Sequence, residues 1–355
     1  MTSLNKYVKY FALAFLIIAS SSSYACDFDG DGIDDPFSYD DSSGLRNWTA
    51  NLSGGGNFIY NNFGAAGDPA VPGYYYNDGK ANIGFVDPIF FWTILAPDLM
   101  PDSQRLNFGI TKARYYASQD WNGDGITDLA KFITPCESIK RSCLNRTATG
   151  NFFINSTDGS TTLSPSQGST ATGLFGKSGF ALLAIDADHD GDDDICYLKH
   201  QKKSPKTFTA ICKDVVSSGK ILKRKVGKFR AQPLKISVNN RDRMLLWRTK
   251  AKKGETKITL IDLANGEKST ATINAILDSS NSKPTVGDWL GTGSQQIGIA
   301  NNGTLHIYDP LTQTSTTQAI PVGTALDCSN NLTATSSSVF LHSRNICRLV
   351  DCTRQ

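Results

Sequence analysis

The stretch DWNGDGITD, residues 120–128, carries the pattern that decides the fold. The same pattern recurs as DFDGDGIDD at residues 27–35 and as DADHDGDDD at residues 186–194. In each copy, oxygen-bearing side chains stand at positions 1, 3, 5 and 9, and glycine stands at position 6. A hard dication such as Ca²⁺ takes about six to eight oxygen ligands, which a tightly curled loop can direct at one point. The loops therefore predict about three bound calcium ions.

Each predicted site has four side-chain ligands and one backbone ligand. The backbone ligand is the carbonyl at position 7, which can turn inward after the sharp turn that glycine allows with a positive φ. The predicted ligands are Asp27, Asp29, Asp31, Ile33 and Asp35; Asp120, Asn122, Asp124, Ile126 and Asp128; and Asp186, Asp188, Asp190, Asp192 and Asp194. Solvated acidic turns are the alternative interpretation, but three copies of one frame favour the metal.

The residues around the loops are typical of strands. An EF-hand needs a bidentate Glu at position 12 and two flanking helices, whereas position 12 is Ser38, Lys131 or Tyr197. Runs suited to strands surround the loops instead, such as residues 113–117 and 129–133. We therefore expect each ion to lie in a strand-loop-strand connection.

Degenerate copies of the loop extend the repeat. Residues 74–82 and 288–296 keep the glycine and lose most carboxylates, while position 2 is mostly aromatic and position 10 mostly apolar. Poorer copies lie around residues 238–247 and 327–340. The period of about 40 to 65 residues is the size of a four-stranded propeller blade. The sequence therefore predicts an all-β protein, a β-propeller of seven blades, with calcium loops between the strands of some blades.

The chain resembles the FG-GAP/VCBS repeat family, whose repeats also build the amino-terminal propeller of integrin α subunits. The likeness rests on the three acidic loops and on the phrase NFG at residues 62–64 and 107–109. It covers about residues 26–310, while the stretch near 205–280 departs from the pattern. The resemblance implies a calcium-binding propeller that acts as a binding or adhesion module for a cell-surface protein or an anionic or glycan ligand.

The first 25 residues resemble a secretory signal peptide. Two lysines precede an apolar run at residues 11–19, and small residues precede a cleavage site after Ala25. We expect residues 26–355 to form one domain, a monomer with no transmembrane segment, in a secreted, periplasmic or cell-surface location. A lipid anchor on Cys26 is the rival interpretation.

All eight cysteines follow residue 25. An even number in an exported chain predicts disulfides. Spacing favours three local pairs and leaves two cysteines at the ends of the mature chain, namely Cys136 with Cys143, Cys196 with Cys212, Cys328 with Cys347, and Cys26 with Cys352. The last bond would close the ring; the alternative is that Cys26 and Cys352 are exposed or otherwise paired.

Charge divides the chain into an acidic and a basic part. Residues 26–198 contain 10 Lys and Arg against 23 Asp and Glu, whereas residues 199–253 contain 18 against two. Strand alternation would place Lys223 and Lys225 on one side, with Lys228 and Arg230 aligned further along. This row predicts binding of an extended polyanion. A solvated basic surface is the alternative, and nucleic acid is not expected because aromatic residues are sparse in this stretch.

Signatures of catalysis are scarce. The chain has four histidines, and none of the common hydrolase or phosphate-binding motifs occurs. We therefore predict no catalytic residues. A lectin or polysaccharide-active enzyme on the same scaffold is the alternative, in which Tyr74 to Tyr76 and Trp92 would stack on sugars rather than pack between blades.

Overall fold

The computed structural model describes residues 26–87, 91–95, 103–107, 115–133, 149–155, 170–177, 182–201, 204–214, 221–227, 233–276, 284–301, 303–320, 324–326 and 332–334. The predicted signal peptide lies outside these residues, as do Cys136, Cys143, Cys328, Cys347 and Cys352.

The described residues form six antiparallel sheets and one short 3₁₀ helix, Ala251–Lys253. The first three sheets consist of β23 (Thr324–Leu326), β1 (Phe37–Asp40), β2 (Asn47–Asn51) and β3 (Asn57–Tyr60); β4 (Gly84–Val86), β5 (Phe91–Leu95) and β6 (Ser103–Asn107); and β24 (Leu332–Ala334), β7 (Tyr115–Gln119), β8 (Asp128–Ile133), β9 (Thr149–Asn155) and β10 (Thr170–Lys177). The fourth to sixth sheets consist of β11 (Leu182–Ile185), β12 (Asp194–Gln201), β13 (Ser204–Lys213) and β14 (Ile221–Gly227); β15 (Leu234–Ser237), β16 (Asp242–Lys250), β17 (Glu255–Ile261) and β18 (Lys268–Ile273); and β19 (Thr285–Gly287), β20 (Gln296–Asn301), β21 (Thr304–Tyr308) and β22 (Ser315–Ala319).

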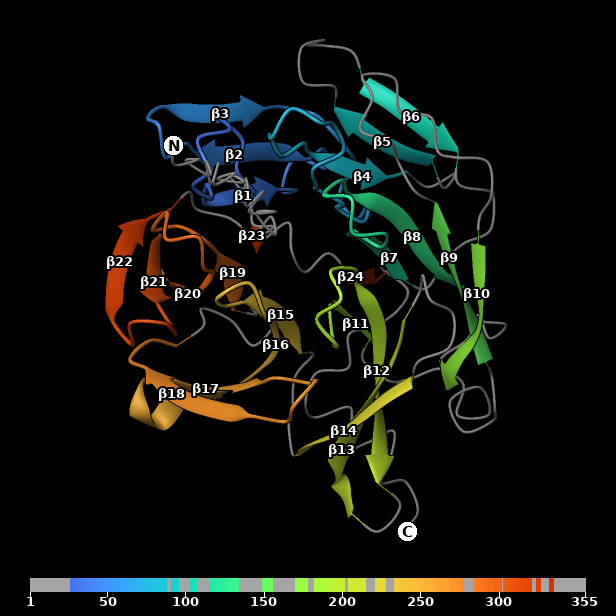
Figure 1. The fold of residues 1–355 in the computed structure, drawn as a ribbon. Coiled ribbons are helices and arrows are strands. Elements are labelled where there is room, and N and C mark those ends of the chain that lie inside the picture. Colours follow the sequence, from blue (N-terminus) through green and yellow to red (C-terminus); the bar gives the residue numbers. More distant parts are fainter. Residues whose placement is uncertain are drawn as a thin grey trace, which may run out of the picture.

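The six sheets are arranged in chain order around a common centre (Figure 1). Strands β11, β15 and β19 lie near this centre, whereas β3, β6, β10, β18 and β22 lie at the periphery (Figure 1). Residues 70–73 add to the second sheet through bridges from Ala70 to Phe85 and from Gly73 to Asn82. The all-β prediction is confirmed.

Strands from the two ends of the described chain share the first sheet. β23 pairs with β1 in the register Phe37 opposite Leu326, so a strand near the C-terminus is the innermost strand of a sheet that otherwise comes from the N-terminal part. β24 pairs with β7 in the third sheet. The copy expected near residue 327 therefore adds strands to two existing sheets, and the described residues form six sheets where seven blades were expected.

The hydrophobic core is divided among the junctions between neighbouring sheets. Leu198 of the fourth sheet and Met244 of the fifth belong to one cluster, and Ile236 of the fifth sheet and Ile297 of the sixth belong to another. A further cluster joins the first sheet to the second. Each sheet thus buries its faces against its neighbours, which is the reason that the isolated repeat unit is not expected to be stable.

One predicted disulfide is confirmed. Cys196 on β12 lies directly opposite Cys212 on β13, and the two sulfurs are bonded within the core of the fourth sheet. Cys26 is also buried and disulfide-bonded, but its predicted partner Cys352 lies outside the described residues. Within the described ranges, no helical segment could serve as a membrane span.

Candidate metal centre

The repeated loops occupy equivalent places in the sheets. Residues 120–128 connect β7 to β8, residues 186–194 connect β11 to β12, and residues 288–296 connect β19 to β20. Residues 74–82 lead into β4, and residues 27–35 lead into β1. The acidic loops at 120–128 and 186–194 therefore each connect two strands, as expected. For residues 27–35, the place of the strand before the loop is taken by β23, which comes from the C-terminal part and pairs with β1.

The glycine at position 6 has a positive φ in all five loops. The angles are 86° at Gly32, 73° at Gly79, 87° at Gly125, 103° at Gly191 and 73° at Gly293. A side chain is strained in this region of φ and ψ, so glycine is needed whether or not the loop carries carboxylates. The repeat therefore preserves the backbone turn in all five loops, including those that have lost most carboxylates.

The apolar positions of the repeat form the core. Position 2 is buried at Tyr75, Trp121 and Trp289. Position 10 is buried in all five loops, at Pro36, Ile83, Leu129, Ile195 and Ile297. Tyr76 and Trp92 are also buried, and the Tyr74 hydroxyl accepts a hydrogen bond from the backbone N–H of Asp27 at 2.9 Å. Tyr75, Tyr76 and Trp92 are therefore buried in the protein and are not exposed for sugar stacking.

The carboxylate at position 1 organises its own loop. Its two oxygens accept hydrogen bonds from the backbone N–H groups at positions 4 or 5 and at position 6. These donors are Gly30 and Gly32 for Asp27, Gly123 and Gly125 for Asp120, His189 and Gly191 for Asp186, and Thr292 and Gly293 for Asp288. Because the loop at 288–296 has no other carboxylate and shares this arrangement, the position 1 aspartate has a structural role in these four loops.

Two of the acidic loops gather three carboxylates each, and these groups leave out Asp31 of the first predicted set and Asp194 of the third. Asp27, Asp29 and Asp35 each offer an oxygen within 4.8 Å of the others, and so do Asp186, Asp188 and Asp190. A third group of the same kind unites Asp192, Asp194 and Asp214. Asp214 was not predicted, because it follows β13 and lies 20 residues after the end of the loop.

The first acidic loop is covered by the turn between β2 and β3. The backbone N–H of Ser53 donates to Asp35 at 2.7 Å, the Ser53 hydroxyl donates to Asp31 at 2.8 Å, and the N–H of Gly54 donates to Asp29 at 3.0 Å. A Cβ at Gly54 would lie 2.8 Å from a carboxylate oxygen of Asp29. A larger residue at position 54 would therefore push the Asp29 carboxylate away from this contact.

The second acidic loop has no three-carboxylate group within the described residues. Its position 3 is Asn122, whose amide donates to Asp124 at 3.0 Å. Asp124 also accepts the backbone N–H of Ile126 at 2.8 Å, and Asp128 accepts the N–H of Trp121 at 3.1 Å. The same contact from position 7 to position 5 joins Ile33 to Asp31 in the first loop.

Burial raises the pKa of several loop carboxyls. Desolvation is the largest cause at Asp35, whose pKa rises to about 6, at Asp192, whose pKa rises to about 7, and at Asp194, whose pKa rises to about 8. The charges of neighbouring aspartates add to this effect at all three. Bringing these carboxylates together as anions is therefore unfavourable without a positive charge.

The loop at residues 288–296 places a side-chain amide where its oxygens converge. The Nε2 of Gln296 donates to Asp288 Oδ1 at 3.1 Å, to Thr292 Oγ1 at 2.9 Å and to the carbonyl of Ser294. These acceptors stand at positions 1, 5 and 7, which are positions of predicted metal ligands in the acidic loops. A donor from position 9 thus satisfies these oxygens within the protein.

Position 8 joins each loop to its neighbour, a role that the sequence analysis missed. The backbone N–H at position 8 donates to the carbonyl at position 1 of the loop in the preceding sheet. In the fifth sheet, Ser237 takes the place of position 1. The pairs are Asp34 to Asp288 at 3.1 Å, Ala81 to Asp27 at 2.7 Å, Thr127 to Tyr74 at 2.7 Å, Asp193 to Asp120 at 3.1 Å, and Gln295 to Ser237 at 2.9 Å. The first of these links the first sheet to the sixth.

Side chains at position 8 return a second hydrogen bond across the same junctions. Thr127 Oγ1 accepts the backbone N–H of Tyr74 at 2.8 Å, and Gln295 Oε1 accepts that of Ser237 at 2.7 Å. The Asp34 carboxylate accepts the N–H of Asp288 in the same way. Each of these junctions is therefore held by a reciprocal pair of hydrogen bonds.

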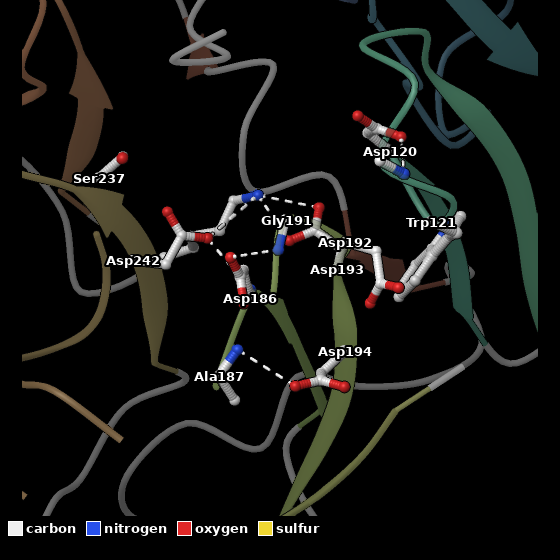
Figure 2. Close-up of polar contacts among 12 residues, drawn as sticks. Asp120, Trp121, Asp186, Ala187, Gly191, Asp192, Asp193, Asp194, Ser237 and Asp242 are labelled. Carbon is white, nitrogen blue, oxygen red and sulfur yellow. Dashed lines mark hydrogen bonds and ion pairs between the residues drawn. The ribbon is translucent and has the colours of Figure 1, made fainter. Parts of the chain in front are cut away.

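A buried ion pair replaces this arrangement between the fourth and fifth sheets. Lys235 Nζ lies 2.9 Å from both carboxylate oxygens of Asp193 and 3.6 Å from Asp242 Oδ2. Figure 2 shows Asp186 facing Asp242, which accepts the Asp186 N–H at 3.1 Å. Burial alone would lower the pKa of Lys235, but Asp193 and Asp242 outweigh it and raise that pKa. Part of the basic stretch therefore pairs with the acidic part.

The poorer copy around residues 238–247 is a tight turn. Val238 and Arg241 exchange backbone hydrogen bonds, and Asn239 and Asn240 have φ angles of 54° and 55°. This is the asparagine-favoured turn that joins two strands of a hairpin. It has no room for a nine-residue metal loop.

Two of the four predicted anion-binding residues are described. Lys223 and Lys225 are exposed on β14, the edge strand of the fourth sheet. Arg224 lies between them, and its guanidinium donates to the carbonyls of Leu263 and Ala264 in the fifth sheet's hairpin. The predicted alternation is thus present at 223–225, while Lys228 and Arg230 lie outside the described residues.

Comparisons with known proteins give only distant likenesses. No protein-family model matches the chain, and no curated protein matches it either. The fold is similar to that of an arginine-to-alanine mutant of AofleA from Arthrobotrys oligospora, at 8% identity and a TM-score of 0.42 over 89% of this chain and 88% of that chain. It is also similar to rhamnogalacturonan lyase YesW, at 14% identity and a TM-score of 0.34 over 81% of this chain and 56% of that chain. Membership of the FG-GAP/VCBS family stays a prediction.

Proposed function

We propose that the chain is an exported, calcium-stabilised β-propeller of six blades that acts as a binding or adhesion module. The scaffold is supported by the hydrogen bonds from position 8 to position 1, which join neighbouring sheets and link the sixth sheet to the first. Sheets stacked around an axis bury their faces and leave only short edges. Export is supported by the disulfide between Cys196 and Cys212, since such bonds persist in oxidising compartments.

Calcium binding is supported by the contrast between the loop at 288–296 and the acidic loops. In the former, oxygens of positions 1, 5 and 7 meet the amide of Gln296. In the acidic loops position 9 is Asp35, Asp128 or Asp194, which as an anion offers no donor. A dication held by these oxygens would take the place of the N–H donors that the amide supplies at 288–296.

The ions would stabilise the ring rather than take part in a reaction. Position 8 lies inside each loop and contacts the preceding sheet, so a loop fixed by calcium also fixes the junction. The carboxylates at positions 1 and 9 already hold backbone N–H groups of the same loop, at Gly125 and Trp121 for example. Calcium would neutralise the remaining negative charge without breaking these hydrogen bonds.

For the partner, we propose an anionic polymer bound along β14. Lys223 and Lys225 are exposed on this edge strand, and the anchored Arg224 between them fixes the strand to the next sheet. Sulfate, phosphate or carboxylate groups in a row would match this spacing of charge. Edge lysines also protect sheets from pairing with other chains. The experiment must distinguish this protective role from binding of an anionic polymer.

Retention on a heparin column tests this proposal. We expect the double variant Lys223→Glu, Lys225→Glu to elute at lower salt than the wild type, with little change in melting temperature, because exposed charges contribute little to stability. The matched control is Lys252→Glu, Lys253→Glu, which changes net charge equally at two exposed residues of the 3₁₀ helix. Equal shifts in both variants would show that only overall charge matters.

A glycan-binding lectin or polysaccharide-active enzyme remains the second candidate. The aromatic residues that would have supported it, Tyr75, Tyr76 and Trp92, are buried, so the candidate now lacks a named sugar-stacking surface within the described residues. Binding to a glycan array that persists in excess heparin would favour this candidate over an anionic partner.

A further inference from the structure

Asp214 and Asp194 face each other at the end of the fourth sheet. Ile195 on β12 pairs with Lys213 on β13, so the next antiparallel pair outward is Asp194 with Asp214. Both are buried, at 2% and 3% exposure. Like charges directly opposite each other on two strands are destabilising, and buried carboxylates increase that cost. The arrangement therefore needs a compensating charge.

The hydrogen bonds of this group leave carboxylate oxygens without donors. Asp194 Oδ2 accepts the backbone N–H of Ala187 at 3.1 Å (Figure 2). Oδ1 of Asp194 and Oδ1 of Asp192 are buried and have no hydrogen-bond partner. Since a buried polar atom is normally satisfied, these two atoms indicate a missing ligand.

Among the described residues, the charges that act on Asp194 do not provide one. Those acting on Asp194 come from Asp188, Asp192 and Asp214. The buried cation of this region, Lys235, is held by Asp193, whose carboxylate it contacts with both oxygens. Strand alternation directs the side chain of Lys213 to the face opposite that of Asp214.

We propose that Asp192, Asp194 and Asp214 bind a second Ca²⁺ beside the ion proposed for Asp186, Asp188 and Asp190. Each trio gathers its oxygens within 4.8 Å, and the two trios share no residue. All donors are carboxylate oxygens, the ligands that Ca²⁺ prefers. The inference deepens the proposed function, because the loop at 186–194 then holds two ions, one of which also ties β13 to the loop.

Counting bound ions by native mass spectrometry tests the proposal. We expect Asp214→Asn and Asp188→Asn each to lose one calcium ion relative to the wild type, and the double variant to lose two. Glu267→Gln, which changes an exposed carboxyl in the fifth sheet's hairpin, should lose none. If Asp214→Asn retains every ion, or if the double variant loses the same single ion as Asp188→Asn, the second site does not exist.

Crystals of the wild type in calcium provide a test that needs no variant. The proposal predicts two anomalous-scattering peaks, one at Asp186, Asp188 and Asp190 and one at Asp192, Asp194 and Asp214. One peak at the first trio alone would overturn this inference and leave the proposed calcium loop intact. No calcium peak at any acidic loop would overturn both.

Discussion

Replacing Gln296 with glutamate should convert the loop at 288–296 into a calcium-dependent one. The substitution keeps the shape of the side chain but replaces the donor NH₂ by a carboxylate oxygen. That oxygen would face Asp288 Oδ1, Thr292 Oγ1 and the carbonyl of Ser294, all of which the amide now satisfies. The variant loop would offer two carboxylates, a hydroxyl and a carbonyl to a cation.

The expected cost without calcium follows from these contacts. The two N–H groups of the amide are shared among three acceptors, so about two hydrogen bonds at about 1 kcal/mol each amount to about 2 kcal/mol. Gln296 is fully buried at 0% exposure, so the new charge adds to the loss. For a chain of this size, a loss of about 2 kcal/mol lowers the melting temperature by roughly 4 °C. Calcium at about 100 times its dissociation constant returns about 2.7 kcal/mol.

The assay is calorimetric melting of wild type and variant, each in chelator and in calcium. The control is Gln295→Glu, which buries a charge one residue away but retains the oxygen that accepts the Ser237 N–H. We expect the difference in melting temperature between wild type and Gln296→Glu to be smaller in calcium than in chelator. The difference between wild type and the control should be the same in both. If calcium changes neither difference in melting temperature, the oxygens of this loop do not converge on a cation position, and the analogy with the acidic loops is wrong.

Other substitutions test the junctions between sheets. Thr127→Val removes a buried acceptor of a backbone N–H and should lower the free energy of unfolding by about 1 to 2 kcal/mol in chemical denaturation, whereas Thr316→Val at an exposed position should have no effect. Lys235→Met should destabilise the protein by about 3 to 5 kcal/mol, because it leaves the buried carboxylate of Asp193 without its cation; adding Asp193→Asn should recover part of that loss. Asp288→Ala should lower the melting temperature without reducing the calcium content measured by elemental analysis, since its loop is satisfied by an amide; loss of an ion would contradict this.

The local features of the fold could be predicted because each is encoded within nine or ten residues. Glycine at position 6 has the positive φ that its turn requires, as at Gly125 and Gly191. Apolar residues at positions 2 and 10, such as Trp121 and Leu129, are buried. The pairing of Cys196 with Cys212 also followed from sequence proximity.

The contacts between sheets could not be predicted, since they join residues far apart in the chain. Position 8 holds Asp34, Thr127 or Gln295, which share no chemical type beyond an oxygen that can accept a hydrogen bond. Asp214 belongs to the candidate site only because β13 returns beside β12. Lys235 was part of a stretch whose positive charge suggested a surface, yet it is buried.

The number of sheets could not be predicted either, because it depends on strand pairing between residues far apart in the chain. A repeat near residue 327 predicted another unit, but β23 completes the first sheet and β24 joins the third. Nothing in the local sequence of residues 324–326 distinguishes a strand that begins a new sheet from one that joins β1. The pairing with β1, which lies far away in the sequence, decides between them.

The proposal that matters most is that the acidic loops bind calcium in the folded protein and thereby stabilise the ring of sheets. The most direct measurement is the melting temperature of protein stripped with chelator, with elemental analysis establishing that the metal is gone, followed by titration with Ca²⁺. Ions bound only by the folded state stabilise it by mass action. If calcium stabilises the ring, the stripped protein has a lower melting temperature, which recovers as calcium is added. An unchanged melting curve in metal-free protein would contradict calcium binding by these loops.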